Sequence, residues 1–376
     1  MAGFYVHIPF CRQACRYCDF HFAVSLGYIP EMVEAMLAEI KHKKARFSPF
    51  TYETLYFGGG TPSVLSIEEL SRLKEEILFH YSFNSSFEFT IEANPDDLTP
   101  EYLKQLKAAG VNRLSIGIQS FIDRDLDLMR RSHNAKQAFQ AIKNAREEGI
   151  TNLNMDLIYG IPGQSIEEWV RNLETAFELE VPHISAYNLS FEPGTVFDHW
   201  RKKGKIVPVP DKLSLEQFRI LKRKMKEKKY EHYEISNFAK SGYRSHHNIL
   251  YWKGVPYSGI GPSAHSFDGN KRFWNISHNK RYMELLKNGG DNYYESEELS
   301  KKDKYNEYIL TGLRTIWGID MDEIQQRFGD NYVKYTFEKA KIHKKKKLLK
   351  QRNQKITLSE KGIFLADYVV REFFMI

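Results

Sequence analysis

Residues 5–20, YVHIPFCRQACRYCDF, place three cysteines in the spacing C-x-x-x-C-x-x-C directly after a short apolar run. These residues, Cys11, Cys15 and Cys18, are all the cysteines of the chain. Residues 4–8 have the pattern of a buried β-strand, so the cysteines are expected in the loop at its C-terminal end. Clustered thiolates are typical ligands of zinc and of iron–sulfur clusters. The stretch therefore predicts a thiolate centre beside the first strand.

The spacing alone leaves the kind of centre open. A structural zinc site needs four protein ligands, and His7 and His21 are near enough in sequence to complete one. A 4Fe-4S cluster held by three cysteines keeps one iron open for another ligand. Three buried thiols without metal are the third alternative. An odd number of cysteines cannot form a disulfide framework.

Apolar strand-like runs alternate with amphipathic helical runs over the first half of the chain. This alternation predicts a parallel sheet with helices on its outside, and six such units suit a partly closed barrel. Parallel barrels place their chemistry at the C-terminal ends of the strands. The expected strands are 4–8, 52–57, 87–92, 113–118, 152–159 and 183–189, and the expected helices are 30–47, 66–80, 99–109 and 165–179, with further helical residues up to 148.

The pattern changes after about residue 291, where helices dominate. The sequence predicts helices at 301–314, 321–328 and 332–341, a hairpin within 346–358 and a last helix at 361–374. This outline is that of a small winged-helix-like α+β domain. We therefore expect two domains, residues 1–290 and residues 300–376.

Composition excludes several classes of protein. Hydrophobic residues make up 42% of the 376 residues and charged residues 27%, which is ordinary for a globular protein. Mean hydropathy is −0.52, and no run approaches the roughly 18 apolar residues that a membrane span needs. Residues 1–10 do not have the pattern of a signal peptide. A secreted scaffold, a membrane protein and a disordered chain are excluded, and the reducing cytoplasm is the expected compartment.

Positive charge is concentrated in one segment. Residues 339–355 contain nine Lys or Arg and no acidic residue, so the net charge of +7 becomes 7 − 9 = −2 for the rest of the chain. A nucleic-acid-binding surface spread over the fold is therefore not expected.

Two motifs together resemble the radical S-adenosylmethionine (SAM) superfamily. One is the cysteine motif, with Tyr17 before the last cysteine, and the other is GGGTP at residues 58–62, after the second strand. The resemblance implies a 4Fe-4S cluster on the three cysteines, with SAM chelated at the open iron. Electron transfer from the cluster in that superfamily cleaves SAM to a 5′-deoxyadenosyl radical. The glycines allow close backbone approach to the ligand. The implied fold is α/β, a partial (β/α)6 TIM-like radical SAM barrel.

Residues 5–11, YVHIPFC, further resemble the opening of the oxygen-independent coproporphyrinogen III oxidase family. Matching motifs are IEANP at 91–95, GIQSF at 117–121 and DLIYG at 156–160. The resemblance implies two groups of residues. The first group would contact SAM. The second would line an adjacent pocket, which holds a second SAM in the oxidase. The two groups are Tyr5, Tyr17, Gly59, Gly60, Thr61 and Glu92, and Gln119, Arg131 and Asp156.

The chain departs from the oxidase pattern at two points. Phe20 stands where the oxidases have a further cysteine, and the long extension before the oxidase motif is absent. Both departures resemble a sister group, the HemW-type heme chaperones. That group has a second signature, H-N-x-x-Y-W, which matches residues 247–252, HNILYW. The heme-binding residues implied by this resemblance are His247, Asn248, Tyr251 and Trp252, with His246 a weaker candidate and His265 a secondary one.

The resemblance implies a cofactor chaperone that binds heme and delivers it to apo-hemoproteins. Neutral imidazole is a common axial ligand of heme iron. The competing enzymatic hypothesis is oxidative decarboxylation of coproporphyrinogen III, and the phenylalanine at position 20 argues against it. A homodimer is a further expectation. The basic run Lys344–Lys347 is expected at a solvated wing tip, and the alternative is a contact with a membrane surface or an acidic partner that docks the chain near membrane-bound heme acceptors.

Overall fold

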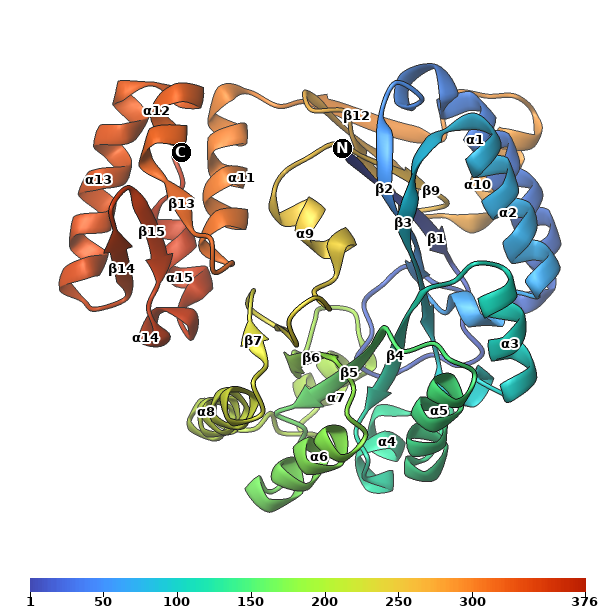
Figure 1. Cartoon of the computed structure of the whole chain (residues 1–376), viewed down its shortest axis with the longest axis horizontal. Helices are drawn as coiled ribbons and strands as arrows, with labels where there is room; N and C mark the ends of the chain where they lie inside the picture. The colour runs from blue at the N-terminus through green and yellow to red at the C-terminus, as the bar shows by residue number, and fades with distance from the viewer.

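The computed structural model describes all 376 residues, and its largest feature is one curved sheet of twelve strands (Figure 1). Six of these strands are parallel and stand side by side in chain order, as the alternation of strands and helices predicts. Their C-terminal ends therefore meet along one edge of the sheet. They are β1 (Ala2–Ile8), β2 (Thr51–Gly59), β3 (Ser82–Ala93), β4 (Arg113–Gln119), β5 (Leu153–Tyr159) and β6 (His183–Asn188).

Helices between these strands cover the outer face of the sheet (Figure 1). The predicted start signals are present: Ser66 and Ser165 each complete a capping box with the glutamate three residues later, and Thr99 caps the helix that begins at Pro100. The helices are α1 (Ile29–Phe47), α2 (Ile67–His80), α3 (Pro100–Ala108), α4 (Asp123–Met129), α5 (Ala135–Glu147) and α6 (Ile166–Glu178).

The sheet extends beyond the six predicted strands at both edges, which corrects the expectation of a sheet built from six units alone. A parallel strand covers the free edge of β1, and antiparallel strands follow it. Each added strand has only two to five residues, too few for periodicity to reveal. The added strands are β9 (Tyr257–Ile260), β10 (His265–Phe267), β11 (Lys271–Asn275) and β12 (Tyr294–Glu298) beyond β1, and β8 (Asn237–Ala239) and β7 (Glu231–His232) beyond β6.

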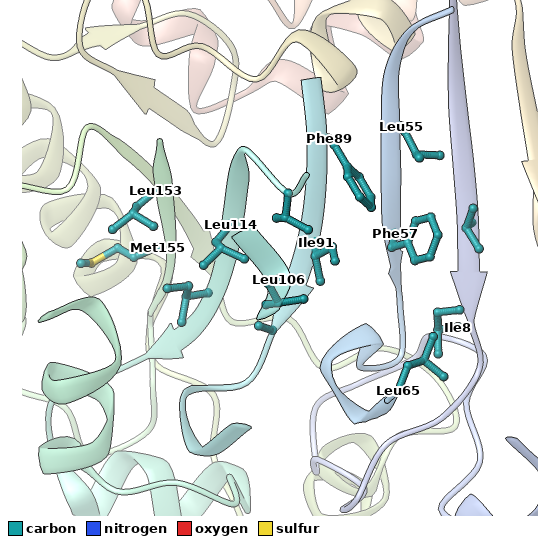
Figure 2. Packing of buried hydrophobic residues seen from close by; sticks show 14 of the residues in the cluster. Ile8, Leu55, Phe57, Leu65, Phe89, Ile91, Leu106, Leu114, Leu153 and Met155 are labelled. Carbon is teal, nitrogen blue, oxygen red and sulfur yellow. The ribbon is translucent and has the colours of Figure 1, made fainter. Parts of the chain in front are cut away.

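The main core lies between the sheet and its outer helices. Figure 2 shows side chains of neighbouring strands forming one continuous apolar layer with Leu106 of α3. Phe57, Ile91 and Leu114 come from three successive strands and have no exposed surface. Burial of each such side chain contributes about 1.5–3 kcal/mol. This layer fixes the positions of the strand ends that form the site.

Four further helices lie between β6 and β12 in the chain, and the segment with α9 crosses from β8 at one edge of the sheet to β9 beside β1. One of them, α9, lies within the curve of the sheet and packs on β1 and β2 (Figure 1). None of the helices of the structure combines the length and the apolar character that a membrane span requires. The four are α7 (Val196–Lys202), α8 (Asp211–Glu227), α9 (His246–Trp252) and α10 (Asn279–Lys287).

Residues after 300 form a separate group of helices with a three-stranded sheet and a hydrophobic cluster of their own. The predicted helix at 361–374 is two helices, because Leu365 leaves the helical conformation with φ −114° and ψ 26°. The elements are α11 (Lys301–Leu313), β13 (Ile319–Asp320), α12 (Met321–Phe328), α13 (Asp330–Lys345), β14 (Leu349–Arg352), β15 (Lys355–Leu358), α14 (Glu360–Ile363) and α15 (Ala366–Glu372).

Candidate functional site

The loop that carries the cysteines leaves the C-terminal end of β1 and is fixed by contacts with distant segments. The Cys11 N–H donates to the carbonyl of Ala23 over 3.0 Å, and the Arg16 N–H donates to that of Met129 over 3.0 Å. The Arg16 guanidinium also lies 4.7 Å above the ring of Trp200. These contacts hold the loop at the strand ends.

A cavity of about 420 Å³ opens beside this loop. It is lined by the three cysteines, which are free and half-buried, and by the ends of β2–β6. Eleven of the twelve residues predicted for the cluster and for SAM line it; Tyr5 instead lines an adjoining cavity of about 410 Å³. The eleven are Cys11, Cys15, Cys18, Tyr17, Gly59, Gly60, Thr61, Glu92, Gln119, Arg131 and Asp156.

Two of the thiols have polar neighbours. Thr61 donates its hydroxyl to Cys11 Sγ over 3.2 Å, and Arg131 Nη1 donates to Cys15 Sγ over 3.3 Å. Burial raises the pKa of Cys11 to about 11 and that of Cys18 to about 12. Because metal ligation requires thiolates, iron binding to this loop would release protons. The two donors are placed to stabilise the thiolates once they form.

The ligand set fits an iron–sulfur cluster better than a single zinc ion. Nowhere in the structure do three His, Cys, Asp or Glu side chains converge closely enough to coordinate one ion. His7 uses both ring nitrogens, one with the Tyr5 hydroxyl at 3.1 Å and one with the His21 carbonyl at 2.9 Å. A cluster with several irons takes its thiolates around a wider space, as three cysteines on one cavity wall provide.

The glycine run at the end of β2 brings backbone close to the cysteine loop. Gly59 has φ +110°, and a Cβ there would lie 2.6 Å from the ring of His7. A Cβ on Gly60 would lie 2.6 Å from the carbonyl oxygen of Phe10, just before Cys11. Any larger residue would displace the loop, so these glycines are required by close approach.

Buried acids lie at the ends of two further strands. Glu92 accepts hydrogen bonds from the Tyr56 hydroxyl over 2.7 Å and from the Gly59 N–H over 3.1 Å, and burial raises its pKa to about 7. Burial also raises the pKa of Asp156, which accepts from Asn154 over 2.8 Å. A cationic ligand in the cavity would favour the ionised form of both acids.

Arg131 and Gln119 also line the cavity, close to Gly117. Arg131 Nη2 donates to Asn94 Oδ1 over 2.6 Å and to the Gly117 carbonyl over 2.9 Å. Its neighbour Arg130 follows the last residue of α4, has left-handed backbone angles and is exposed. Arg131 therefore lines the site, whereas Arg130 faces solvent. Gln119 has φ +64°, at an irregularity in the pairing of β4 with β5. Such a conformation in a residue with a side chain is typical of functional sites.

Sequence reasoning missed several residues of the cavity wall. Asn94 holds Arg131 in place and follows β3 directly, within the IEANP motif. Ser115 on β4 and Asn188 at the end of β6 also line the cavity. A rule that marks every polar residue at the C-terminal end of a predicted parallel strand would have found Asn94 and Asn188.

The second motif occupies a different environment. His247 lies on α9 and is 2% exposed. Its Nδ1 lies 2.6 Å from the Thr54 hydroxyl and its Nε2 lies 3.2 Å from the Tyr251 hydroxyl, while its ring stacks on Tyr56 at 4.7 Å. Burial lowers its pKa to about 3, so the imidazole is neutral. In this arrangement neither ring nitrogen is free to bind iron.

The rest of the motif is not gathered around one open site. Tyr251 lines the cavity of about 410 Å³ that adjoins the cysteine loop, whereas Asn248 and Trp252 are half-buried outside both cavities. His246 is exposed, and His265 is exposed at the rim of the same cavity as Tyr251. Within the motif, His247 is therefore buried, whereas Tyr251 faces the cavity beside the cysteine loop.

Comparison with known proteins agrees with this geometry. Residues 5–176 match the Radical SAM superfamily, and residues 299–365 match the HemN C-terminal domain. The structure of coproporphyrinogen III oxidase (HemN) from Escherichia coli superposes with a TM-score of 0.85 at 25% identity, covering 99% of this chain and 89% of that one. The fold and the cysteine-lined cavity therefore define a protein of the radical SAM superfamily.

Two relatives identify the family within this superfamily. Heme chaperone HemW of Bacillus subtilis is 36% identical over 352 residues, which cover 91% of this chain and 93% of that protein. Heme chaperone HemW of Escherichia coli is 36% identical over 263 residues, 69% of this chain and 68% of that protein. The chain belongs to the HemW family. Its superfamily implies a 4Fe-4S cluster and SAM.

Proposed function

We propose that this chain is a heme chaperone that binds heme and delivers it to apo-hemoproteins. The observation that carries the proposal is the similarity to the Bacillus subtilis heme chaperone over nearly the whole of both chains. The phenylalanine at position 20, where the oxidase family has a further cysteine, is consistent with it. This side chain is 67% exposed at the mouth of the cysteine-lined cavity.

The cysteine-lined cavity is the proposed cofactor site. Cys11, Cys15 and Cys18 would each hold one iron of a 4Fe-4S cluster, which supplies a single electron and an open iron for SAM. Glu92 is placed to accept from a cationic ligand group, and Arg131 to meet an anionic one. The proposed SAM contacts, in the first or the adjacent pocket, are Tyr5, Tyr17, Gly59, Gly60, Thr61, Glu92, Gln119, Arg131 and Asp156.

The proposed heme contacts are His247, Asn248, Tyr251 and Trp252, and the buried His247 must be uncovered before heme can reach it. Iron can reach His247 only after its hydrogen bond with Thr54 or that with Tyr251 is broken. Tyr251 lies between the two sites, because it contacts the histidine and lines the cavity beside the cysteine loop. Heme binding would thus be linked to the cofactor cavity through this tyrosine.

Hemin titration of the anaerobically reconstituted chain tests the chaperone function. We expect stoichiometric binding in the wild type and transfer of the bound heme to an apo-hemoprotein. Binding should weaken strongly in His247→Ala and stay unchanged in His246→Ala, whose side chain is exposed. Absence of binding in the wild type would contradict the proposal. Anaerobic loss of coproporphyrinogen III in the same preparation would instead support the oxidase activity.

Further parts of the proposal concern the C-terminal region and the cell. We propose residues 1–290 and 300–376 as separate domains, the second winged-helix-like; a separate hydrophobic cluster and the match to the HemN C-terminal domain support this division.

The end of α13 and the following turn present Lys344–Lys347, the proposed contact with membranes or membrane-bound acceptors. Glutamine at these four positions should weaken binding to anionic vesicles, and unchanged binding would exclude the contact. Three unpaired thiols are consistent with the cytoplasm.

A further inference from the structure

A second large cavity lies far from the cysteine loop, where α8 at the edge of the sheet faces α14 of the C-terminal region (Figure 1). Its volume is about 850 Å³, within the range of small-molecule sites. Aromatic and aliphatic side chains form much of its lining. These residues are Leu215, Met225, Tyr230, Phe238, Phe364 and Leu365. A flat apolar ligand would be in contact with ring faces and edges here.

Cations surround this apolar lining. Arg219 and Arg223 each have a glutamate partner on α8, at 3.8 and 3.9 Å. Lys222, Lys226 and Lys361 have no ion-pair partner, and burial lowers the pKa of Lys222. The carboxylate of Glu360 is the one acidic group of the lining. The cavity therefore has unpaired positive charge beside an apolar surface, which suits a ligand with a flat apolar body and carboxylates.

His232 gives the cavity a metal ligand. Its ring stacks on Phe238 with 4.2 Å between centroids and an angle of 11°. Its Nε2 donates to the carbonyl of Ile235 over 3.1 Å, which fixes the neutral tautomer with the lone pair on Nδ1. The Nδ1 atom of His232 has no hydrogen-bond partner, and part of its surface is open to solvent. Metal-binding histidines usually donate their other nitrogen to a carbonyl in this manner.

We propose that this cavity is a second binding site for an iron porphyrin, with His232 as iron ligand and Lys222 and Lys226 as partners of the propionates. The inference rests on the proposed function, since it takes heme as the ligand. It differs in location, because His247 is enclosed whereas His232 faces an open cavity. The site joins the sheet to the C-terminal region, so its occupation would couple the two.

The test uses the full chain with three variants. Lys222→Gln/Lys226→Gln removes the proposed carboxylate partners. Lys212→Gln/Lys228→Gln removes two exposed charges outside the cavity, one within α8 and one at its C-terminal cap. His232→Phe keeps an aromatic ring on Phe238 but removes the ligand. Each is titrated with hemin and with metal-free protoporphyrin, followed by absorbance and fluorescence. Circular dichroism and unfolding check that the variants fold.

We expect the Lys222/Lys226 pair to weaken both porphyrins by about tenfold, as loss of charge-assisted contacts does, and the control pair to leave both unchanged. His232→Phe should change the hemin spectrum and affinity but leave protoporphyrin binding intact. Unchanged hemin affinity and spectrum in both cavity variants, with loss in His247→Ala, would overturn the second site and leave the chaperone function standing. Absence of hemin binding in the wild type would overturn both.

Discussion

At the C-terminal ends of β1 and β2 polar side chains surround an open cavity, whereas near the start of the same strands they pack against one another. Cys15 and Arg131 represent the first region, in which thiols, acids and a guanidinium share a cavity of about 420 Å³. His247 represents the second, with both ring nitrogens engaged and two tyrosine rings against it. Tyr56 connects the two regions, because its ring stacks on His247 at 4.7 Å and its hydroxyl donates to Glu92 over 2.7 Å.

This comparison separates groups held ready for a ligand from groups that stabilise the fold. A buried polar group that is fully hydrogen-bonded contributes to stability and resists exposure. Side chains that line a cavity with close backbone approach, such as those around Gly60, leave room for a ligand. The proposed cofactor binding at the cysteine end would use an open cavity, whereas the proposed heme binding to His247 would first break one of its hydrogen bonds.

Loss of one proposed cluster ligand gives the largest expected effect. Cys15→Ala should abolish cluster assembly, because two thiolates cannot hold a cluster that takes three. We expect the reconstituted variant to lose nearly all of its iron, acid-labile sulfide and visible absorbance. Arg12→Ala, on an exposed side chain of the same loop, should retain the wild-type iron content. A Cys15→Ala protein with full iron content would show that the cluster lies elsewhere.

Removal of His247 tests the closed region. His247→Ala leaves a cavity beside Tyr56 and unpairs the hydroxyls of Thr54 and Tyr251, so we expect a loss of about 3 kcal/mol in the free energy of unfolding. The exposed neighbour His246→Ala should change it by less than about 0.5 kcal/mol. Chemical denaturation of the chain without heme measures both. If His247→Ala abolishes heme binding at unchanged stability, the histidine is a ligand and not a structural residue.

The sequence predicted the open region far better than the closed one, for physical reasons. The cysteines, the glycine run and the strand-end acids follow a rule of topology, since the C-terminal ends of parallel strands converge. The environment of His247 depends on Thr54, which is 193 residues away and belongs to no motif. Strands of two to five residues, such as β9 and β10, have too short a pattern to be seen, so the full width of the sheet was missed.

A smaller effect is expected from the backbone contact between the glycine run and the cysteine loop. Gly60→Ala places a Cβ 2.6 Å from the Phe10 carbonyl and should shift the loop before Cys11. We expect SAM affinity, measured by calorimetry on the cluster-loaded chain, to fall by about tenfold, or about 1.4 kcal/mol. Gly27→Ala is the matched control, because its Cβ would meet nothing within 4 Å. Equal SAM affinities in the two variants would mean that the contact between residue 60 and the cysteine loop tolerates a side chain.

The smallest effect concerns the pH dependence of stability at the open end. Burial raises the pKa of Glu92 from 4.5 to about 7, so the folded chain keeps a proton that the unfolded chain releases over this interval. Since the folded state binds more protons there, this residue lowers stability as the pH rises from about 4.5 to 7. Glu92→Gln stays uncharged, and its stability should fall less steeply than that of the wild type. Denaturation across this range measures the slope, with the exposed Glu147→Gln as control. Parallel curves for all three proteins would mean that Glu92 is solvated in the folded chain and that the open cavity is wetter than its burial indicates.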